Sequence, residues 1–121
     1  MQRTNDLLDR TREFALATIK FCEGLPKDET SKILSRQLLR AGTSVGANYR
    51  AAYRAKSKAD FISKMGTVLE EADECGYWVD LLSAAGKVEP ARSGPLQQEA
   101  DELVTITIAS INTARRNLEP E

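Results

Sequence analysis

The sequence predicts an all-α protein built from four helices. Four segments with the apolar periodicity of amphipathic helices are separated by three short breaks, and no segment shows the alternation and turn signals of a β-sheet. A chain of 121 residues, of which 41% are hydrophobic and 29% charged, fits one domain around one core. We therefore expect a single four-helix-bundle domain over residues 1–121, with helices at about 5–22, 28–55, 57–86 and 94–117.

The first helix is expected to begin with Asn5 as its N-cap, because a short polar side chain can accept a hydrogen bond from a free backbone N–H of the first turn. Gly24 and Pro26 end it, since glycine favours a helix C-terminus and proline cannot continue the hydrogen-bond ladder. Its apolar surface is predicted to come from Leu7, Leu8, Phe14, Leu16, Ile19 and Phe21.

The second helix is expected to start near 28–31 and to pass through Gly42 and Gly46. Each glycine costs up to ~1 kcal/mol relative to alanine inside a helix. The apolar phase nevertheless continues across both, within an arc of roughly 80°. This arc contains Leu34, Leu38, Ala41, Val45, Tyr49 and Ala52. We interpret the small residues as a continuous helix against which another backbone packs closely.

The third helix carries the clearest pattern in the chain. Ser57 and Asp60 have the spacing of a capping box, which places its start there. A heptad seam then continues over three heptads, and Gly86 ends the helix. The seam consists of Phe61, Met65, Val68, Ala72, Cys75, Val79 and Leu82.

The fourth helix is expected to start at about residue 94, with Ser93 as its cap and Pro95 in its first turn. The segment 104–111 alternates like a strand and is rich in β-branched residues. We predict helix there as well, because no turn signal flanks it and a lone strand would have no partner.

Composition argues against an enzyme. The chain has no histidine, which removes the commonest general base and the commonest metal ligand. Cys22 and Cys75 lie in apolar patterns and are interpreted as buried free thiols, so no metal and no cofactor is expected. No apolar run approaches the ~20 residues of a membrane span, and the start MQRTNDLLDR lacks the apolar region of a signal peptide. We expect a cytoplasmic protein without a membrane partner.

Positive charge is concentrated in one segment. Residues 30–59 contain no acidic residue and carry a net charge of +7, although the whole chain carries −1. Six of the seven cations fall on one helix face opposite the apolar arc: Lys32, Arg36, Arg40, Arg50, Arg54 and Lys58. Lys58 belongs to this set only if the helix has not ended before it. Such a stripe can bind nucleic-acid phosphates, or it can be a solvated or interface-paired face. We expect no stacking aromatic residue on it.

A second surface is predicted on the third helix, on the side away from the heptad seam. Its residues are Glu70, Glu74, Tyr77, Trp78 and Leu81. The heptad seam of this helix already packs in the core, so a second apolar patch beside acidic residues indicates a partner. We expect this partner to be a neighbouring subunit whose basic stripe meets Glu70 or Glu74. Asn48, at the edge of the core arc, is expected to be a structural polar residue bonded to Glu71 or Glu74.

Two runs resemble a known family. SVGANYRAAYRAKSKADF, from Ser44 to Phe61, and EEADECGYW, from Glu70 to Trp78, are similar to the bacterial four-helix-bundle family also called the intervening-sequence proteins of large-subunit ribosomal RNA. The residues that match the family pattern are Gln37, Leu38, Ser44, Val45, Ala47, Asn48 and Phe61, then Glu71, Ala72, Glu74, Tyr77 and Trp78.

This resemblance implies an antiparallel up-down four-helix bundle that assembles into a homopentamer and has no established enzyme activity. The implied fold is also similar to that of the accessory variability determinant of diversity-generating retroelements. By analogy, this similarity implies RNA or DNA and a reverse transcriptase as partners. Our first hypothesis is a non-enzymatic oligomer that binds structured RNA non-specifically. The alternative is a protein-interaction or scaffold module whose arginines serve subunit contacts.

Overall fold

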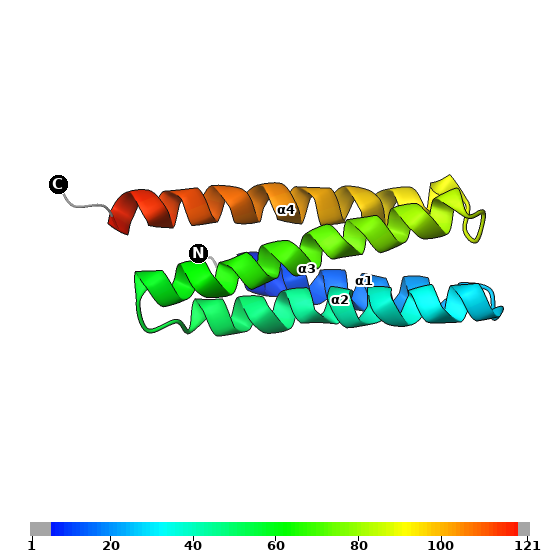
Figure 1. Cartoon of the computed structure of the whole chain (residues 1–121), viewed down its shortest axis with the longest axis horizontal. Helices are drawn as coiled ribbons and strands as arrows, with labels where there is room; N and C mark the ends of the chain where they lie inside the picture. The colour runs from blue at the N-terminus through cyan, green and yellow to red at the C-terminus, as the bar shows by residue number, and fades with distance from the viewer. Residues whose placement is uncertain (1–5, 119–121) are drawn as a thin grey trace.

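The computed structural model of the protein describes residues 6–118, and these form four α-helices and no β-strand (Figure 1). The helices are α1 Asp6–Glu23, α2 Glu29–Tyr53, α3 Lys58–Ala84 and α4 Pro90–Leu118. The predicted all-α class is therefore confirmed. Asn5, the predicted first N-cap, lies outside the described residues.

Two of the predicted helix starts have clear capping geometry. The Asp28 carboxylate accepts a hydrogen bond of 2.9 Å from the backbone N–H of Ser31, and a second of 3.0 Å from its hydroxyl group. At α3, the Ser57 hydroxyl accepts a hydrogen bond of 3.0 Å from the backbone N–H of Asp60. These side chains satisfy donors that a first helical turn leaves free.

The fourth helix begins earlier than the sequence indicated. Its first turn starts at Pro90, where the Glu89 carbonyl accepts from the N–H groups of Arg92 and Ser93 at 2.9 and 3.1 Å. Pro90 fits the first helical position, because a backbone N–H at that position would have no partner inside the helix. Pro95 consequently lies inside α4, and Ser93 is a buried residue of the helix instead of its cap. The β-branched segment 104–111 is helical, as predicted.

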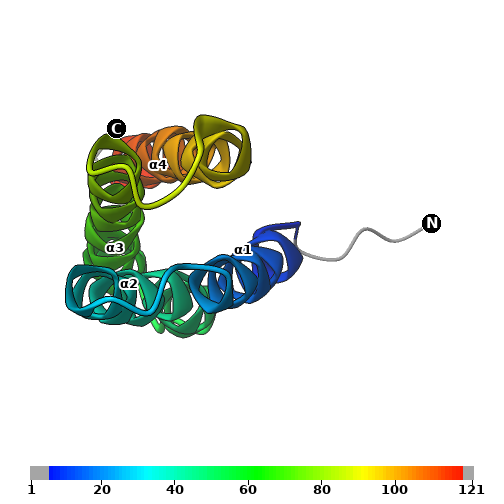
Figure 2. The same ribbon diagram turned by 90° about the vertical axis from the view of Figure 1, so that its right-hand side faces the viewer.

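The core lies on both sides of α3. This helix packs against α2 on one side and α4 on the other, α1 packs on α2, and α1 and α4 make few contacts. Viewed end-on, the four helices form an open C (Figure 2). Six residues of the predicted heptad seam are fully buried: Met65, Val68, Ala72, Cys75, Val79 and Leu82. On α1, Phe14 and Phe21 are buried, whereas Leu16 and Ile19 are exposed.

The predicted close packing at the α2 glycines is confirmed. A Cβ atom on Gly42 would lie 2.6 Å from Cγ2 of Thr18, and one on Gly46 would lie 3.3 Å from the backbone oxygen of Thr11. Both neighbours are on α1, and α2 remains continuous through both positions. The glycines therefore allow the α1 and α2 backbones to approach each other at the cost of helix propensity.

Candidate nucleic-acid interface

The basic residues of α2 separate into two groups. Lys32, Arg36, Arg50 and Arg54 are exposed, and no ion pair involves them within residues 6–118. We call these four residues the basic face. They occur in two pairs, one near each end of α2, and the members of each pair are one helical turn apart.

Arg40 is engaged inside the molecule. Its guanidinium group forms ion pairs with Glu71, at 3.2 Å, and with Glu74, and thereby connects α2 to α3. Glu74 also accepts a hydrogen bond of 3.4 Å from the indole N–H of Trp78. Periodicity placed Arg40 with the other cations, but the position of the α3 carboxylates gives it a structural contact.

Lys58 does not continue the basic face. The chain leaves the helix at Tyr53, and Arg54 is the C-cap of α2, with its N–H 3.2 Å from the carbonyl oxygens of Arg50 and Ala51. Lys58 is the first residue of α3, on the other side of this connection. The stripe predicted from one unbroken helix therefore ends at Arg54.

A groove lies between α1 and α2 beside the second pair of the basic face. It has a volume of about 520 Å³, and its lining includes Arg12 of α1, Arg50 and Tyr53 of α2, and the C-cap residue Arg54. The Tyr53 side chain is 55% exposed. The expectation that no aromatic residue accompanies the cations is therefore wrong. Arg12 was missed because only the packing of α1 on α2 places it beside Arg50.

The predicted oligomer surface on α3 has mixed exposure. Tyr77 is 57% exposed, and its ring contacts the Trp78 ring edge-on, with centroids 5.0 Å apart. Glu70 is exposed, Trp78 and Leu81 are half-buried, and Glu74 belongs to the Arg40 contact.

Asn48 differs from the expected arrangement. Its side-chain amide donates a hydrogen bond of 2.9 Å to the backbone oxygen of Ser44, one turn earlier in α2. The predicted partners, Glu71 and Glu74, are instead bonded to Arg40. A guanidinium group reaches across to α3 and offers a charged donor, so it takes the carboxylates that a short amide side chain was expected to hold.

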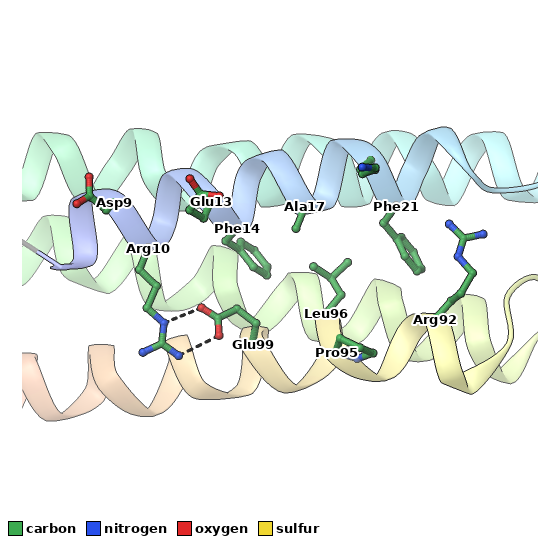
Figure 3. Close-up of a pocket in the computed structure, with 11 residues that line it drawn as sticks. Asp9, Arg10, Glu13, Phe14, Ala17, Phe21, Arg92, Pro95, Leu96 and Glu99 are labelled. Atoms are coloured by element: carbon green, nitrogen blue, oxygen red, sulfur yellow. Dashed lines mark hydrogen bonds and ion pairs between the residues drawn. The ribbon is translucent and has the colours of Figure 1, made fainter.

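A second groove, of about 920 Å³, lies between α1 and α4 (Figure 3). Phe14, Phe21 and Leu96 form its apolar floor. At one end, the Arg10 guanidinium group donates hydrogen bonds of 2.7 and 2.9 Å to Glu99 and one of 2.5 Å to Glu102. These hydrogen bonds raise the pKa of Arg10, and those to Glu99 have the largest effect.

At the other end of this α1–α4 groove, the Arg92 guanidinium group lies 5.9 Å from the centre of the Phe21 ring and donates a hydrogen bond of 3.3 Å to the Gly24 carbonyl. The sequence pattern gave no sign of the groove, because Phe14, Phe21 and Leu96 are all typical core residues.

Cys22 and Cys75 are free thiols, and neither is exposed. Cys75 is buried, and burial raises the pKa of its thiol to about 12; burial also raises the pKa of the half-buried Cys22. Within residues 6–118, no three histidine, cysteine, aspartate or glutamate side chains are grouped so as to hold a metal ion. No helix in this range combines the length and apolar character that a bilayer span needs.

Comparison with known proteins identifies the family. A family model described as "23S rRNA-intervening sequence protein" matches residues 3–109. The chain is also similar to a solved structure of a protein of unknown function from the S23 ribosomal protein family of Bacteroides thetaiotaomicron VPI-5482. The two are 33% identical with a TM-score of 0.81, over 87% of this chain and 97% of the other. A comparison with curated proteins found no match. The chain thus belongs to the family of 23S rRNA-intervening sequence proteins, as its sequence indicated.

Proposed function

We propose that the protein is a non-enzymatic cytoplasmic helical bundle, antiparallel and up-down, that binds structured RNA non-specifically. The observation that carries this proposal is the basic face of α2, where Lys32, Arg36, Arg50 and Arg54 are exposed and have no ion pair among the described residues. The rest of the chain has a net negative charge, and by helical periodicity these four cations share one face of α2.

The spacing of these cations suits a phosphate backbone. Residues four apart on a helix are separated by ~6 Å along its axis, and the two pairs are centred ~27 Å apart. Each pair can therefore meet phosphates of a different part of a folded RNA. Binding releases condensed counterions, which makes the affinity strongly dependent on salt but largely independent of sequence.

A double charge reversal tests this function. Arg50→Glu with Arg54→Glu should abolish RNA retention at ~50 mM salt, since two phosphate contacts are replaced by repulsion. The matched control is Arg115→Glu with Arg116→Glu, which changes the net charge equally on exposed positions of α4. Fluorescence anisotropy with a labelled hairpin RNA measures the affinity. Absence of binding by the wild type, or equal weakening by both double variants, would refute the proposal.

The alternative, a protein-interaction or scaffold module whose arginines serve subunit contacts, is favoured by a different observation. Tyr77 is an exposed aromatic residue of α3, and the groove with an apolar floor lies between α1 and α4. In the end-on view, α3 lies across from the opening between α1 and α4 (Figure 2). We propose that the α3 face of one copy enters the groove of a second copy, with Glu70 facing Lys20 or Arg92. Two different complementary surfaces give head-to-tail contacts, which form a ring where the rotation between copies closes. The family resemblance favours five subunits.

Sedimentation velocity tests the assembly. The wild type should sediment as an oligomer at micromolar concentration, and Tyr77→Ala should shift it toward the 13.4 kDa chain. Tyr53→Ala is the control, because it removes an equally exposed tyrosine from α2. A wild-type monomer, or dissociation by the control variant alone, would contradict this arrangement.

A further inference from the structure

The groove between α1 and α2 is a product of the close helix packing. A Cβ atom added to Gly46 would lie 3.3 Å from the backbone oxygen of Thr11, so the backbones of α1 and α2 approach each other closely at this point. Next to Gly46, the side chains of Ala15 and Ala47 are too short to fill the space between the helices. The result is a concave site of about 520 Å³, within the size range of pockets that admit small molecules.

The sides of this groove are mainly positive. Arg12 approaches from α1, Arg50 and Arg54 approach from α2, and Asp9 contributes one carboxylate, so the lining carries a net charge of +2. Arg12 has an ion pair with Glu13 at 4.0 Å, in which both side chains are 74% exposed. An exposed pair at that distance is weak, and the guanidinium group of Arg12 can exchange it for a phosphate.

An aromatic residue lines the same groove as the cations. Tyr53 is 55% exposed, and its ring packs against the buried Tyr49 ring, with centroids 6.4 Å apart and planes inclined at 42°. The contact with Tyr49 restricts the position of the Tyr53 ring, while more than half of the side chain stays accessible. An exposed ring next to guanidinium groups is the combination that holds a stacked base and its phosphate.

We infer that this groove binds an unpaired nucleotide, with its base stacked on Tyr53 and its phosphate held by Arg12, Arg50 and Arg54. The inference rests on the proposed RNA binding and gives it a preference, because a base inside a duplex has no free face to offer to Tyr53. The basic face would attract any nucleic acid, whereas the groove selects loops, bulges and single strands.

The experiment compares a labelled single-stranded RNA of mixed sequence with its own duplex and with a single-stranded DNA of the same sequence. Tyr53→Ala should weaken binding of both single strands roughly 5- to 150-fold, the loss expected for one stacked base, and should leave duplex binding unchanged. Tyr53→Phe keeps the ring and should bind like the wild type. Ile33→Ala is the matched control, because Ile33 is an exposed apolar residue, 47% accessible, on the same helix.

A second readout locates the nucleotide directly. Photo-crosslinking with a 4-thiouridine-containing RNA should label a peptide that includes Tyr53 in the wild type and should fail in Tyr53→Ala. Equal losses for single strand and duplex, or no loss in Tyr53→Ala while Arg50→Glu with Arg54→Glu abolishes binding, would overturn the inference and leave the proposed function standing. No binding of any RNA by the wild type would overturn both.

Discussion

Gly42 offers the sharpest test of how the bundle is packed. In Gly42→Ala, the new Cβ would lie 2.6 Å from Cγ2, 2.8 Å from Oγ1 and 2.9 Å from Cβ of Thr18. Thr18 is fully buried, and its hydroxyl group donates a hydrogen bond of 2.8 Å to the Phe14 carbonyl. Because the Cβ of Thr18 is itself too close, relief requires the backbone of α1 to move.

The expected magnitude follows from two opposing effects. Replacing a helical glycine by alanine stabilises the helix by up to ~1 kcal/mol, whereas overpacking a tight core costs about 1–3 kcal/mol. We expect Gly42→Ala to lower the free energy of unfolding by about 1–2 kcal/mol. Gly66→Ala on α3 is the matched control, since a Cβ there meets nothing within 4 Å, and it should gain about 0.5–1 kcal/mol.

Urea unfolding followed by far-UV circular dichroism, at one fixed protein concentration, measures both variants. Heating gives a second measurement, in which each kcal/mol corresponds to about 4 °C in Tm for a chain of this size. Thr18→Ala removes both γ atoms, so the double variant with Gly42→Ala should recover part of the loss. Gly42→Ala being as stable as Gly66→Ala would show that α1 does not pack against α2 at this distance.

Two further predictions concern ionisable groups. The Ser31 backbone N–H lowers the pKa of Asp28, so the stability that this carboxylate adds is present above the unfolded pKa of about 4 and is lost as the pH falls through the lower, folded value. Asp28→Asn keeps an acceptor for Ser31 but removes the negative charge. The variant should therefore be less stable than wild type at pH 7 and equally stable near pH 2, where the carboxyl group of the wild type is protonated. Urea midpoints that differ equally at both pH values would contradict this. In Cys22→Ser, the remaining buried thiol, Cys75, with its pKa raised to about 12, should react with iodoacetamide at pH 8 only as fast as the chain unfolds. Mass spectrometry should therefore show labelling that accelerates through the urea transition, and fast labelling of the native protein would disprove the burial.

Much of the fold could be predicted because local signals determine it. The Ser57 cap, the α3 heptad seam and the uninterrupted apolar phase of α2 depend on residues close together in the sequence. The start of α4 was harder, because both Pro90 and Pro95 fit a first turn and only the Glu89 carbonyl contacts decide between them.

The candidate site was less predictable, since it depends on contacts between helices. Arg40 and Arg50 look equivalent in sequence, yet Arg40 lies opposite Glu71 and Glu74. Periodicity assigns a residue to a face of its own helix and does not say what the neighbouring helix brings to it. For the same reason, neither Arg12 at the α1–α2 groove nor the whole α1–α4 groove could be found from the sequence.

The role of each cation on α2 depends on which neighbouring helix it faces. Toward α3, Arg40 is bonded to carboxylates and contributes to the bundle. On the side of α2 that faces α1, Gly42 and Gly46 have no side chains. The α1 backbone can therefore pack closely, and Arg12 lies beside Arg50. The small residues therefore have an effect beyond packing: a larger residue at Gly46 would move α1 and also change the groove. Stability and nucleotide binding should accordingly respond together at Gly46, whereas at the exposed Tyr53 binding should change alone.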